Sequence, residues 1–382
     1  YCYNHATNSG CFESVDQAGH LWYTTYPMAR LNPEQFSAVH HTEGPLLVLA
    51  GAGSGKTQVI TSRIVHLLAK LHVPADQILA VTFTNKAAKE MQERVRHAAG
   101  KQAEGILIST FHSLGVRILR RDIRRLGYKP NFTIYSDSDQ AGVVRQALTD
   151  LNIDTKQFPP DMVRWQISMA KNRLVSAEQY PKQGSTPLEQ VTAQAYPRYQ
   201  QLLRAYNAID FDDIIMLTVQ MLEELAEVRQ YWQTRFRYIM VDEYQDTNAC
   251  QYRLISLLAQ QHGNLCVVGD DDQAIYGWRG ADVANILNFA QERQGCSVVK
   301  LEQNYRSTGA ILQAANAVIR NNSKRSDKAL WTASGTGELI NLLAADTDDD
   351  EARLVVEQLQ LAQYRSQRPW RDFAVLYRSN TQ

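Results

Sequence analysis

The stretch PLLVLAGAGSGKT, residues 45–57, decides the fold of this chain. A short apolar run breaks into glycines, and the residues after them place their apolar positions on one face of a helix. This order predicts a strand, a loop that can wrap a phosphate, and a helix. Ala50 occupies the first position of the pattern, where glycine is usual, and a small residue costs little at the end of a strand. The one-sided apolar residues of the helix are Ile60, Ile64, Leu67 and Leu68.

The residue types in this loop suit a nucleoside triphosphate. Glycines permit the positive φ angles with which successive backbone N–H groups can point at phosphate oxygens. Lys56 would add a positive charge at the β- and γ-phosphates, and the hydroxyl of Thr57 would hold Mg²⁺. A glycine turn that binds nothing is the alternative, and the strand and helix around the loop count against it. The predicted phosphate-binding residues are Ala50, Gly51, Ala52, Gly53, Ser54, Gly55, Lys56 and Thr57.

Length and composition indicate a globular protein of about two or three domains. The chain has 382 residues, of which 44% are hydrophobic and 21% charged, with a formal net charge of zero. A polyanion would therefore have to bind in a local groove. The five cysteines are scattered, with no C-x-x-C pair and no zinc spacing, which favours a reduced cytoplasmic protein. No apolar run reaches the roughly 18 residues of a membrane span, and we expect no membrane partner.

Further apolar runs predict a doubly wound parallel α/β core, interrupted by helices. Runs at 78–83, 106–109, 238–241 and 265–268 alternate with helical segments, as buried parallel strands do. Residues 1–27 have no clear period, and we expect a disordered extension before Met28. The predicted boundaries are 1–27 for this extension, 28–113 and 206–294 for the two parts of the first domain, 114–205 for an all-helical insertion, and 295–382 for a partial second domain with strands at 297–301, 338–344 and 373–377.

The first helix of the predicted insertion carries a run of basic residues. A solvated helix face and a contact with DNA phosphates both explain such a run, and the sequence leaves the two open. The residues are Arg117, Arg120, Arg121, Arg124, Arg125 and Lys129.

A second strong signal is YIMVDEYQD, residues 238–246. An apolar strand delivers Asp242 and Glu243 at its carboxyl end, where an open parallel sheet places its ligand site. Asp242 would hold Mg²⁺, and Glu243 would orient and deprotonate the water that attacks the γ-phosphate. Such a pair alone would more often be a solvated turn, but the phosphate loop favours a catalytic role.

The loop VVGDDDQAIYGWRGAD, residues 267–282, combines carboxylates, an amide and aromatic rings. Gln273 supplies the amide. Tyr276 and Trp278, interleaved with Arg279, are typical of a loop that stacks on nucleic-acid bases. Burial of Trp278 in the core is the alternative.

Two rim segments and one arginine complete the candidates. Phe83, Thr84 and Asn85 follow one predicted strand, and Phe111 and His112 follow another, where a polar and aromatic rim would suit single-stranded nucleic acid. A lone histidine such as His112 is more often a hydrogen-bonded core or rim residue. Arg306, in LEQNYRS, could reach a γ-phosphate as an arginine finger, and a surface salt bridge is its alternative.

In these stretches the chain resembles the superfamily 1 DNA helicases of the Rep/UvrD/PcrA group, most closely the Rep branch, from about Met28 to Gln382. The signatures are AGAGSGKT, VTFTNKAAKEM, STFHSLG, DFDD, VDEYQDTN, VVGDDDQAIYGWRGA, LEQNYRS and VLYRSN. The resemblance implies two RecA-like P-loop domains with ATP and Mg²⁺ between them, and a helical insertion, called 1B, in the first. It also implies 3′→5′ translocation on single-stranded DNA, with unwinding of duplexes at single/double-strand junctions during replication or repair.

The resemblance assigns roles to further residues. Gln35 looks like an adenine-reading glutamine, with an ordinary surface glutamine as the alternative, and Tyr305 looks like an adenine-stacking ring. Gln273 resembles a γ-phosphate sensor and Arg306 the arginine finger. Gln58 departs from the pattern, because relatives usually have arginine there. The positions that match DNA contacts are Phe83, Asn85, Tyr276, Trp278 and Arg279.

The resemblance also leaves open what the chain does alone. In the family the second RecA-like domain, 2A, is split by an insertion called 2B, and further motifs follow it. We therefore expect a fragment that hydrolyses ATP poorly. A nucleotide-gated module that binds single-stranded DNA without helicase activity is the alternative, and a helicase fused to a nuclease is a third interpretation. The family has replication-fork partners and a bacterial cytoplasmic setting, and both a monomer and a DNA-induced dimer remain open.

Overall fold

The computed structural model describes residues 13–15, 21–23, 31–323 and 325–377. β1 (Glu13–Val15) and β2 (Leu21–Tyr23) pair in antiparallel fashion, so the expected disorder does not hold for these two segments. The rest of the predicted extension lies outside the described residues.

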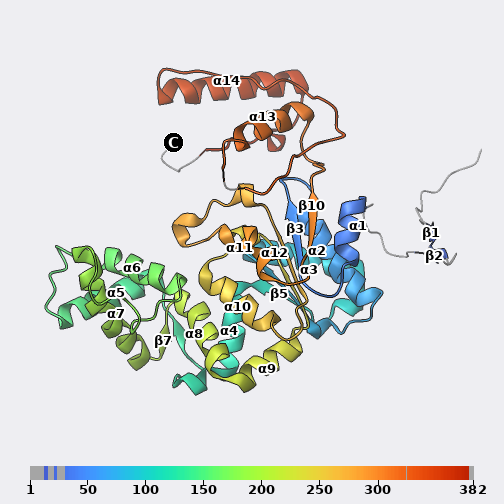
Figure 1. Ribbon diagram of the computed structural model, residues 1–382. Coiled ribbons are helices and arrows are strands. Elements are labelled where there is room, and N and C mark those ends of the chain that lie inside the picture. The colour runs from blue at the N-terminus through green and yellow to red at the C-terminus, as the bar shows by residue number, and fades with distance from the viewer. Residues whose placement is uncertain (1–12, 16–20, 24–30, 324, 378–382) are drawn as a thin grey trace, which may run out of the picture.

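The centre of the fold is a six-stranded parallel sheet in the order β10-β3-β9-β8-β4-β5. β10, β3 and β5 are labelled in Figure 1. Its apolar runs alternate with helices along the chain, which confirms the predicted parallel P-loop core. The strands are β3 (Leu46–Ala50), β4 (Ile78–Thr82), β5 (Leu107–Thr110), β8 (Tyr238–Val241), β9 (Leu265–Gly269) and β10 (Ser297–Leu301).

Helices cover both faces of this sheet, because successive strand residues point to opposite sides. Leu46 and Val48 pack in one apolar cluster with three helices, and Leu47 and Leu49 pack in the other with four. The first face carries α1 (Pro33–His40), α2 (Lys56–Ala69) and α3 (Asn85–Ala99). The second carries α4 (Phe111–Asp122), α8 (Phe211–Glu224), α9 (Ala226–Arg235) and α10 (Ala249–Ala259), beside the short α11 (Ala284–Leu287) and α12 (Phe289–Glu292).

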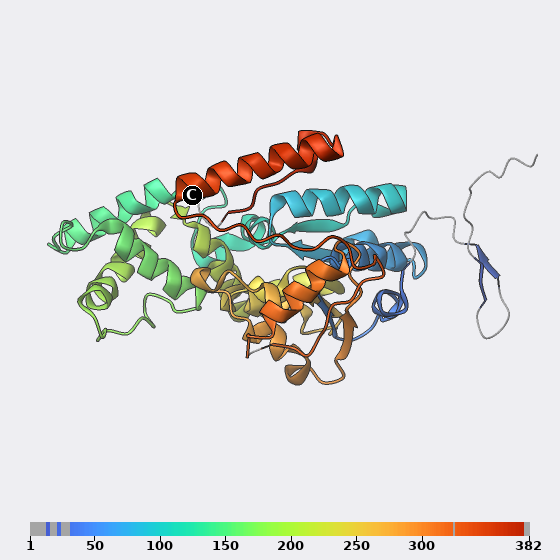
Figure 2. The ribbon, with the colours of Figure 1, turned by 90° about the horizontal axis from the view of Figure 1, so that it is seen from above.

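Three helices form a separate lobe to one side of the sheet, shown in green in Figure 1 and from above in Figure 2. They are α5 (Asp137–Asp150), α6 (Pro160–Asn172) and α7 (Pro187–Ala205), and their buried apolar residues make a cluster of their own. The short strands β6 (Thr133–Ile134) and β7 (Ala208–Ile209) pair in parallel where the chain enters and leaves the lobe.

The lobe begins later than residue 114, the expected start of the insertion. α4 belongs to the sheet's core, because Leu114, Ile118 and Leu119 are buried in the same cluster as the strands. Three of the six basic residues on α4 and the turn after it contact other parts of the chain. Arg121 stacks over Tyr231, Arg120 over Phe132, and Arg125 pairs with Glu227. These contacts favour the solvated helix face over a phosphate contact.

A buried ion cluster ties the lobe to the core. Lys171 on α6 is fully buried, with its Nζ 2.5 Å from Asp210 Oδ2 and 2.7 Å from Asp213 Oδ1 at the start of α8. Burial opposes the charge of Lys171, but the two carboxylates outweigh it and raise the pKa of Lys171 well above its usual value. The orientation of α6 against α8 therefore depends on this cluster.

The segment after the sheet differs most from expectation. The sequence predicts that Ser297–Leu301 opens the second domain, but this strand, β10, pairs with β3 in the first sheet. Two further expected strands, 338–344 and 373–377, form no strand, and the side chain of Leu376 is 95% exposed. A strand needs a neighbour for its hydrogen bonds, and no such neighbour lies beside these runs within the described residues. The helices of this region are α13 (Gly309–Ile319) and α14 (Asp348–Ser366).

Within the described residues, no helix combines the length and apolar character needed to cross a bilayer.

We predict that Lys171→Met strongly destabilises the chain, because it leaves Asp210 and Asp213 buried without their cation. The free energy of unfolding, measured by urea denaturation, should fall by about 3–5 kcal/mol. Lys156→Met, at an exposed lysine of the same lobe, is the matched control and should change it by less than about 0.5 kcal/mol. Equal stability of the two variants would contradict this role for Lys171.

Candidate nucleotide and nucleic-acid site

The phosphate loop connects β3 to α2 with two residues in the left-handed region. Gly53 has φ 68° and Gly55 has φ 87°, which other residue types adopt only with strain. The Ser54 hydroxyl donates to Gly51 O at 2.8 Å and closes the loop. α2 begins at Lys56 without a side-chain cap, so the first N–H groups of the helix remain available for an anion.

Gln35 contacts the phosphate loop through its side chain. It is buried, and its Nε2 donates to Ser54 O at 2.9 Å while its Oε1 accepts from Asn32 N at 3.1 Å. The alternative of an ordinary surface glutamine is therefore wrong. The contacts give Gln35 a role in holding the loop, and adenine reading stays a prediction.

The predicted catalytic carboxylates lie beside the loop. Lys56 Nζ is 3.3 Å from Glu243 Oε2, which brings together β8 and the start of α2. Asp242 is buried, and burial followed by the nearby charge of Glu243 raises its pKa to about 6, although Lys56 opposes the shift. Glu243 itself has φ 50°, a strained backbone conformation of the kind found at functional sites. Thr57 follows Lys56 in the first turn of α2.

A second wall faces the loop from the other side. Asn304 Nδ2 donates to Ala52 O at 2.6 Å, and Tyr305 N donates to Gly53 O at 3.0 Å. The Asn304 Oδ1 accepts from Arg306 N at 2.8 Å and so fixes the turn that carries this arginine. The side chain of Arg306 is exposed, and it makes no ion pair among the described residues, which counts against the surface salt bridge. These contacts place Asn304, Tyr305 and Arg306 directly against the phosphate loop.

Tyr305 lies next to the start of α1. Its hydroxyl accepts from Asn32 Nδ2 at 3.0 Å and donates to Gln303 Oε1 at 2.9 Å, while the ring is half exposed. An exposed ring beside the loop is available for stacking, as the resemblance implies.

Gln273 connects to the catalytic carboxylate through other side chains. Its Nε2 donates to the Asp270 carboxylate. The Asp270 N–H donates to Gln245 Oε1 at 3.0 Å, and Gln245 Nε2 donates to Glu243 Oε2 at 2.9 Å. The five residues Lys56, Glu243, Gln245, Asp270 and Gln273 therefore form one continuous network.

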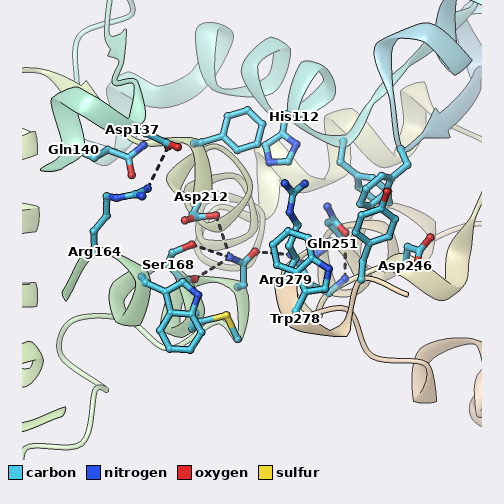
Figure 3. Close-up of a pocket in the computed structure, with 18 residues that line it drawn as sticks. His112, Asp137, Gln140, Arg164, Ser168, Asp212, Asp246, Gln251, Trp278 and Arg279 are labelled. Carbon is cyan, nitrogen blue, oxygen red and sulfur yellow. Dashed lines mark hydrogen bonds and ion pairs between the residues drawn. The ribbon is translucent and has the colours of Figure 1, made fainter. Parts of the chain in front are cut away.

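A cavity of about 490 Å³ lies between the core and the helical lobe (Figure 3). In Figure 3, Arg164 and Ser168 of the lobe lie across the cavity from Asp246. Most of the predicted nucleic-acid residues border it. These are Phe83, Phe111, His112, Tyr276, Trp278 and Arg279.

The rings of this cavity form an open aromatic surface. The ring centroids of Phe83 and Tyr276 are 5.2 Å apart, those of Tyr276 and Trp278 are 6.4 Å apart, and Arg279 lies 4.6 Å from the Trp278 ring. The side chain of Trp278 is 61% exposed, so the alternative of core burial is wrong. An exposed row of rings with a cation is the arrangement that stacks on unpaired bases.

Three predicted contacts differ from the others in their surroundings. Phe111 borders the cavity but is only 2% exposed and packs in the core of α4 and the sheet, so its contact with nucleic acid stays a prediction. Thr84 and Asn85 are exposed and line an adjoining hollow of about 540 Å³ together with Phe83 and His112. The Thr84 hydroxyl also accepts from Ala87 N and caps α3.

Two aromatic residues of the cavity were not predicted from the sequence. Phe211 stacks on His112 with ring centroids 3.8 Å apart, and it stands within the quoted DFDD stretch, which could have revealed it. Trp165, on α6 of the lobe, borders the same cavity and is 53% exposed. No local motif marks it, because only the packing of the lobe brings it to the cavity.

His112 is uncharged at neutral pH. Its burial lowers the pKa to about 4, so at pH 7 the ring offers stacking and hydrogen bonding but no positive charge. The cations of the cavity are Arg164, which pairs with Asp137 at 3.2 Å, and Arg279.

We predict that His112→Phe makes the stability of the chain less sensitive to acid. Between pH 6.5 and about 4 the unfolded histidine binds a proton that the folded one does not, so wild-type stability falls as the pH falls. The difference in unfolding free energy between variant and wild type should grow by up to about 1.4 kcal/mol per pH unit over this window. Urea denaturation at pH 7, 6 and 5 measures it. A constant difference would show that His112 titrates normally.

Comparisons with known proteins agree with this geometry. Residues 31–294 match the sequence model of the UvrD/REP helicase N-terminal domain, and residues 299–382 match that of the UvrD-like helicase C-terminal domain. The ATP-dependent DNA helicase PcrA of Staphylococcus aureus (strain Mu50) is 51% identical over 352 residues, covering 92% of this chain and 48% of the relative. PcrA of Staphylococcus epidermidis (strain ATCC 12228) gives the same identity and coverage.

The chain thus spans about half the length of the curated relatives it matches. The expected nearness to the Rep branch stays a prediction within the group. The two family models together match most of the chain, and their residues include the phosphate loop, the carboxylates of β8 and the turn with Arg306. The chain belongs to the UvrD/REP family of helicases.

Proposed function

We propose that this chain binds ATP with Mg²⁺ at the phosphate loop, binds single-stranded DNA along the aromatic cavity, and belongs to a protein that couples ATP hydrolysis to 3′→5′ duplex unwinding. One observation carries the proposal. The open N–H groups of the loop and the Lys56–Glu243 pair lie on one side, and the turn that carries Arg306 packs against the loop from the other. Junction binding, replication-fork partners and a cytoplasmic setting extend it by family resemblance.

Thr57 and Asp242 suit a divalent cation. Asp242 is a buried carboxylate whose charge is destabilised by burial and by Glu243, and a cation beside it would compensate that charge. When bound, Mg²⁺ would supply charge stabilisation at the β- and γ-phosphates.

The other residues have separable roles in hydrolysis. The N–H groups of the loop and Lys56 hold the phosphates. Glu243, at 3.3 Å from Lys56, orients the attacking water and takes its proton. Gln273 senses the γ-phosphate, and Arg306 stabilises the charge that develops on the transferred group.

We predict that, in the complete protein, Lys56→Ala and Glu243→Gln both abolish ATP turnover, but with different effects on binding. Loss of Lys56 removes a charged phosphate contact, so affinity for a fluorescent ATP analogue should fall about tenfold or more. Glu243→Gln keeps the shape of the site, so the affinity should stay within about threefold of the wild type. Phosphate release and fluorescence titration measure the two effects. A complete protein that binds ATP and DNA without hydrolysing ATP would favour the nucleotide-gated module, and a chain that binds no nucleotide would refute the proposal.

We predict that Trp278→Ala and Trp165→Ala each weaken binding of a fluorescent oligothymidylate by about 5- to 100-fold, as expected for loss of one stacked base. Fluorescence anisotropy measures the affinity. Trp370→Ala is the matched control, because this residue is 56% exposed but does not border the cavity, and it should bind as the wild type does. Unchanged affinity of Trp278→Ala would count against DNA binding in this cavity. Reduced affinity of Trp278→Ala with normal affinity of Trp165→Ala would exclude only a DNA contact on the side of the cavity that the lobe forms.

A further inference from the structure

After α13, the residues Arg325–Trp331 contact two distant parts of the site. We call these residues the bridging segment. Its central residue, Lys328, is buried, with Nζ 2.9 Å from both Asp270 Oδ1 and Asp272 Oδ2. The Asp271 carboxylate accepts from the same Nζ. One lysine is thus shared by three consecutive carboxylates of the loop after β9.

Arg325 completes this cluster. Its Nε and Nη2 donate to the two oxygens of Asp272 at 2.9 and 2.8 Å, and its Nη2 also donates to Lys328 O at 3.0 Å. Burial opposes the charge of Lys328, but the carboxylates, Asp270 foremost, outweigh it and raise the pKa of Lys328. Charges buried in this way persist only with their partners, so the cluster holds the bridging segment firmly on the loop.

The other end of the bridging segment supports the turn that carries Arg306. Trp331 N donates to Glu302 O at 3.0 Å, and Asn304 N donates to Trp331 O at 2.8 Å. Ala329 N donates to Glu302 Oε1 at 2.8 Å. The bridging segment therefore runs beside residues 302–304, immediately before Tyr305 and Arg306.

The same segment also touches the phosphate loop. A Cβ built on Gly51 would collide with Leu330 Cδ2, so the Leu330 side chain occupies the space beside this glycine. Asp270, at the first end, joins the network of Gln273 and Glu243. The bridging segment thus connects the γ-phosphate sensor, the phosphate loop and the arginine turn.

We propose that Lys328 and Arg325 are positioning residues that hold Arg306 at the γ-phosphate end of the nucleotide site. They act through the three carboxylates at one end of the bridging segment and through Glu302–Asn304 at the other. The proposal rests on the proposed binding of ATP at this loop. An arginine stabilises phosphate charge only when its backbone is fixed at the right place, and the exposed side chain of Arg306 depends on its turn for that. Lys328 and Arg325 act through Arg306 and do not touch the nucleotide.

The test compares how the chain binds a diphosphate and a triphosphate. Affinities for mant-ADP and for the non-hydrolysable mant-AMPPNP, both with Mg²⁺, are measured by fluorescence titration of the 382-residue chain. The wild type should prefer the triphosphate, because only this ligand reaches Arg306. Lys328→Met should lower the preference about tenfold, the effect of one lost hydrogen bond to a charged group, and leave mant-ADP affinity within about twofold. Lys328→Arg should restore part of the preference.

A double-mutant cycle separates positioning from general structure. Arg306→Ala should lower the preference as Lys328→Met does, and the double variant should lower it no further, because Lys328 acts through Arg306. Arg320→Met, an exposed cation at the end of α13, is the matched control and should behave as the wild type. Circular dichroism reports whether each variant folds. Should Lys328→Met not fold, the half-buried Arg325→Gln decides, with a smaller loss of preference in the same direction expected.

The outcomes are distinguishable. An unchanged preference in a folded Lys328→Met or Arg325→Gln variant would overturn the positioning role while leaving the proposed function intact. An equal loss of both ligands, or effects of Lys328→Met and Arg306→Ala that add, would also overturn it, because the role would then be structural. A wild-type chain that binds neither nucleotide would refute the proposed function and this inference with it.

Discussion

The hydrogen bonds from Asn304 and Tyr305 to the carbonyl oxygens of Ala52 and Gly53 are the contacts on which the rest of the site depends. A loop that presents its N–H groups to a phosphate must satisfy its carbonyl groups elsewhere. Here the chain after β10 satisfies them, and in doing so it brings Arg306 against the loop. The close packing also explains the glycine at position 53, because a Cβ there would lie 2.7 Å from Asn304 Nδ2. The loop and the arginine turn are therefore one structural unit.

Two ligand surfaces are joined by side chains of the loop after β9. Asp270 and Gln273 belong to the network of Lys56 and Glu243, whereas Tyr276, Trp278 and Arg279, a few residues later, border the aromatic cavity. Gln273 and these rings lie on one short loop, so a shift of Gln273 would also displace the rings of the cavity. The helical lobe supplies the opposite side of this cavity, and the buried pairs of Lys171 fix its helix α6. The proposed nucleotide and nucleic-acid sites thus share one structural frame.

Much of the core could be predicted from the sequence, because the strands around the loop are apolar runs bounded by polar ends. Leu46–Ala50 and Tyr238–Val241 illustrate this, and so does the delivery of Asp242 at a strand end. Long-range pairing could not be predicted. The sequence shows that Ser297–Leu301 forms a strand but not that it joins β3, and an apolar run such as 338–344 forms no strand without a neighbour. Trp165 and Lys328 have no local pattern at all, since only tertiary packing brings them to the site.

The central claim is that the phosphate loop and the turn with Arg306 form the two walls of one nucleotide site. A crystal structure of the chain with Mg²⁺ and a non-hydrolysable ATP analogue tests it most directly. We expect the phosphates to accept hydrogen bonds from the N–H groups of the loop and from Lys56, with the Arg306 guanidinium within hydrogen-bond distance of the γ-phosphate. A nucleotide bound elsewhere, or one held by the loop while Arg306 points away, would contradict the claim.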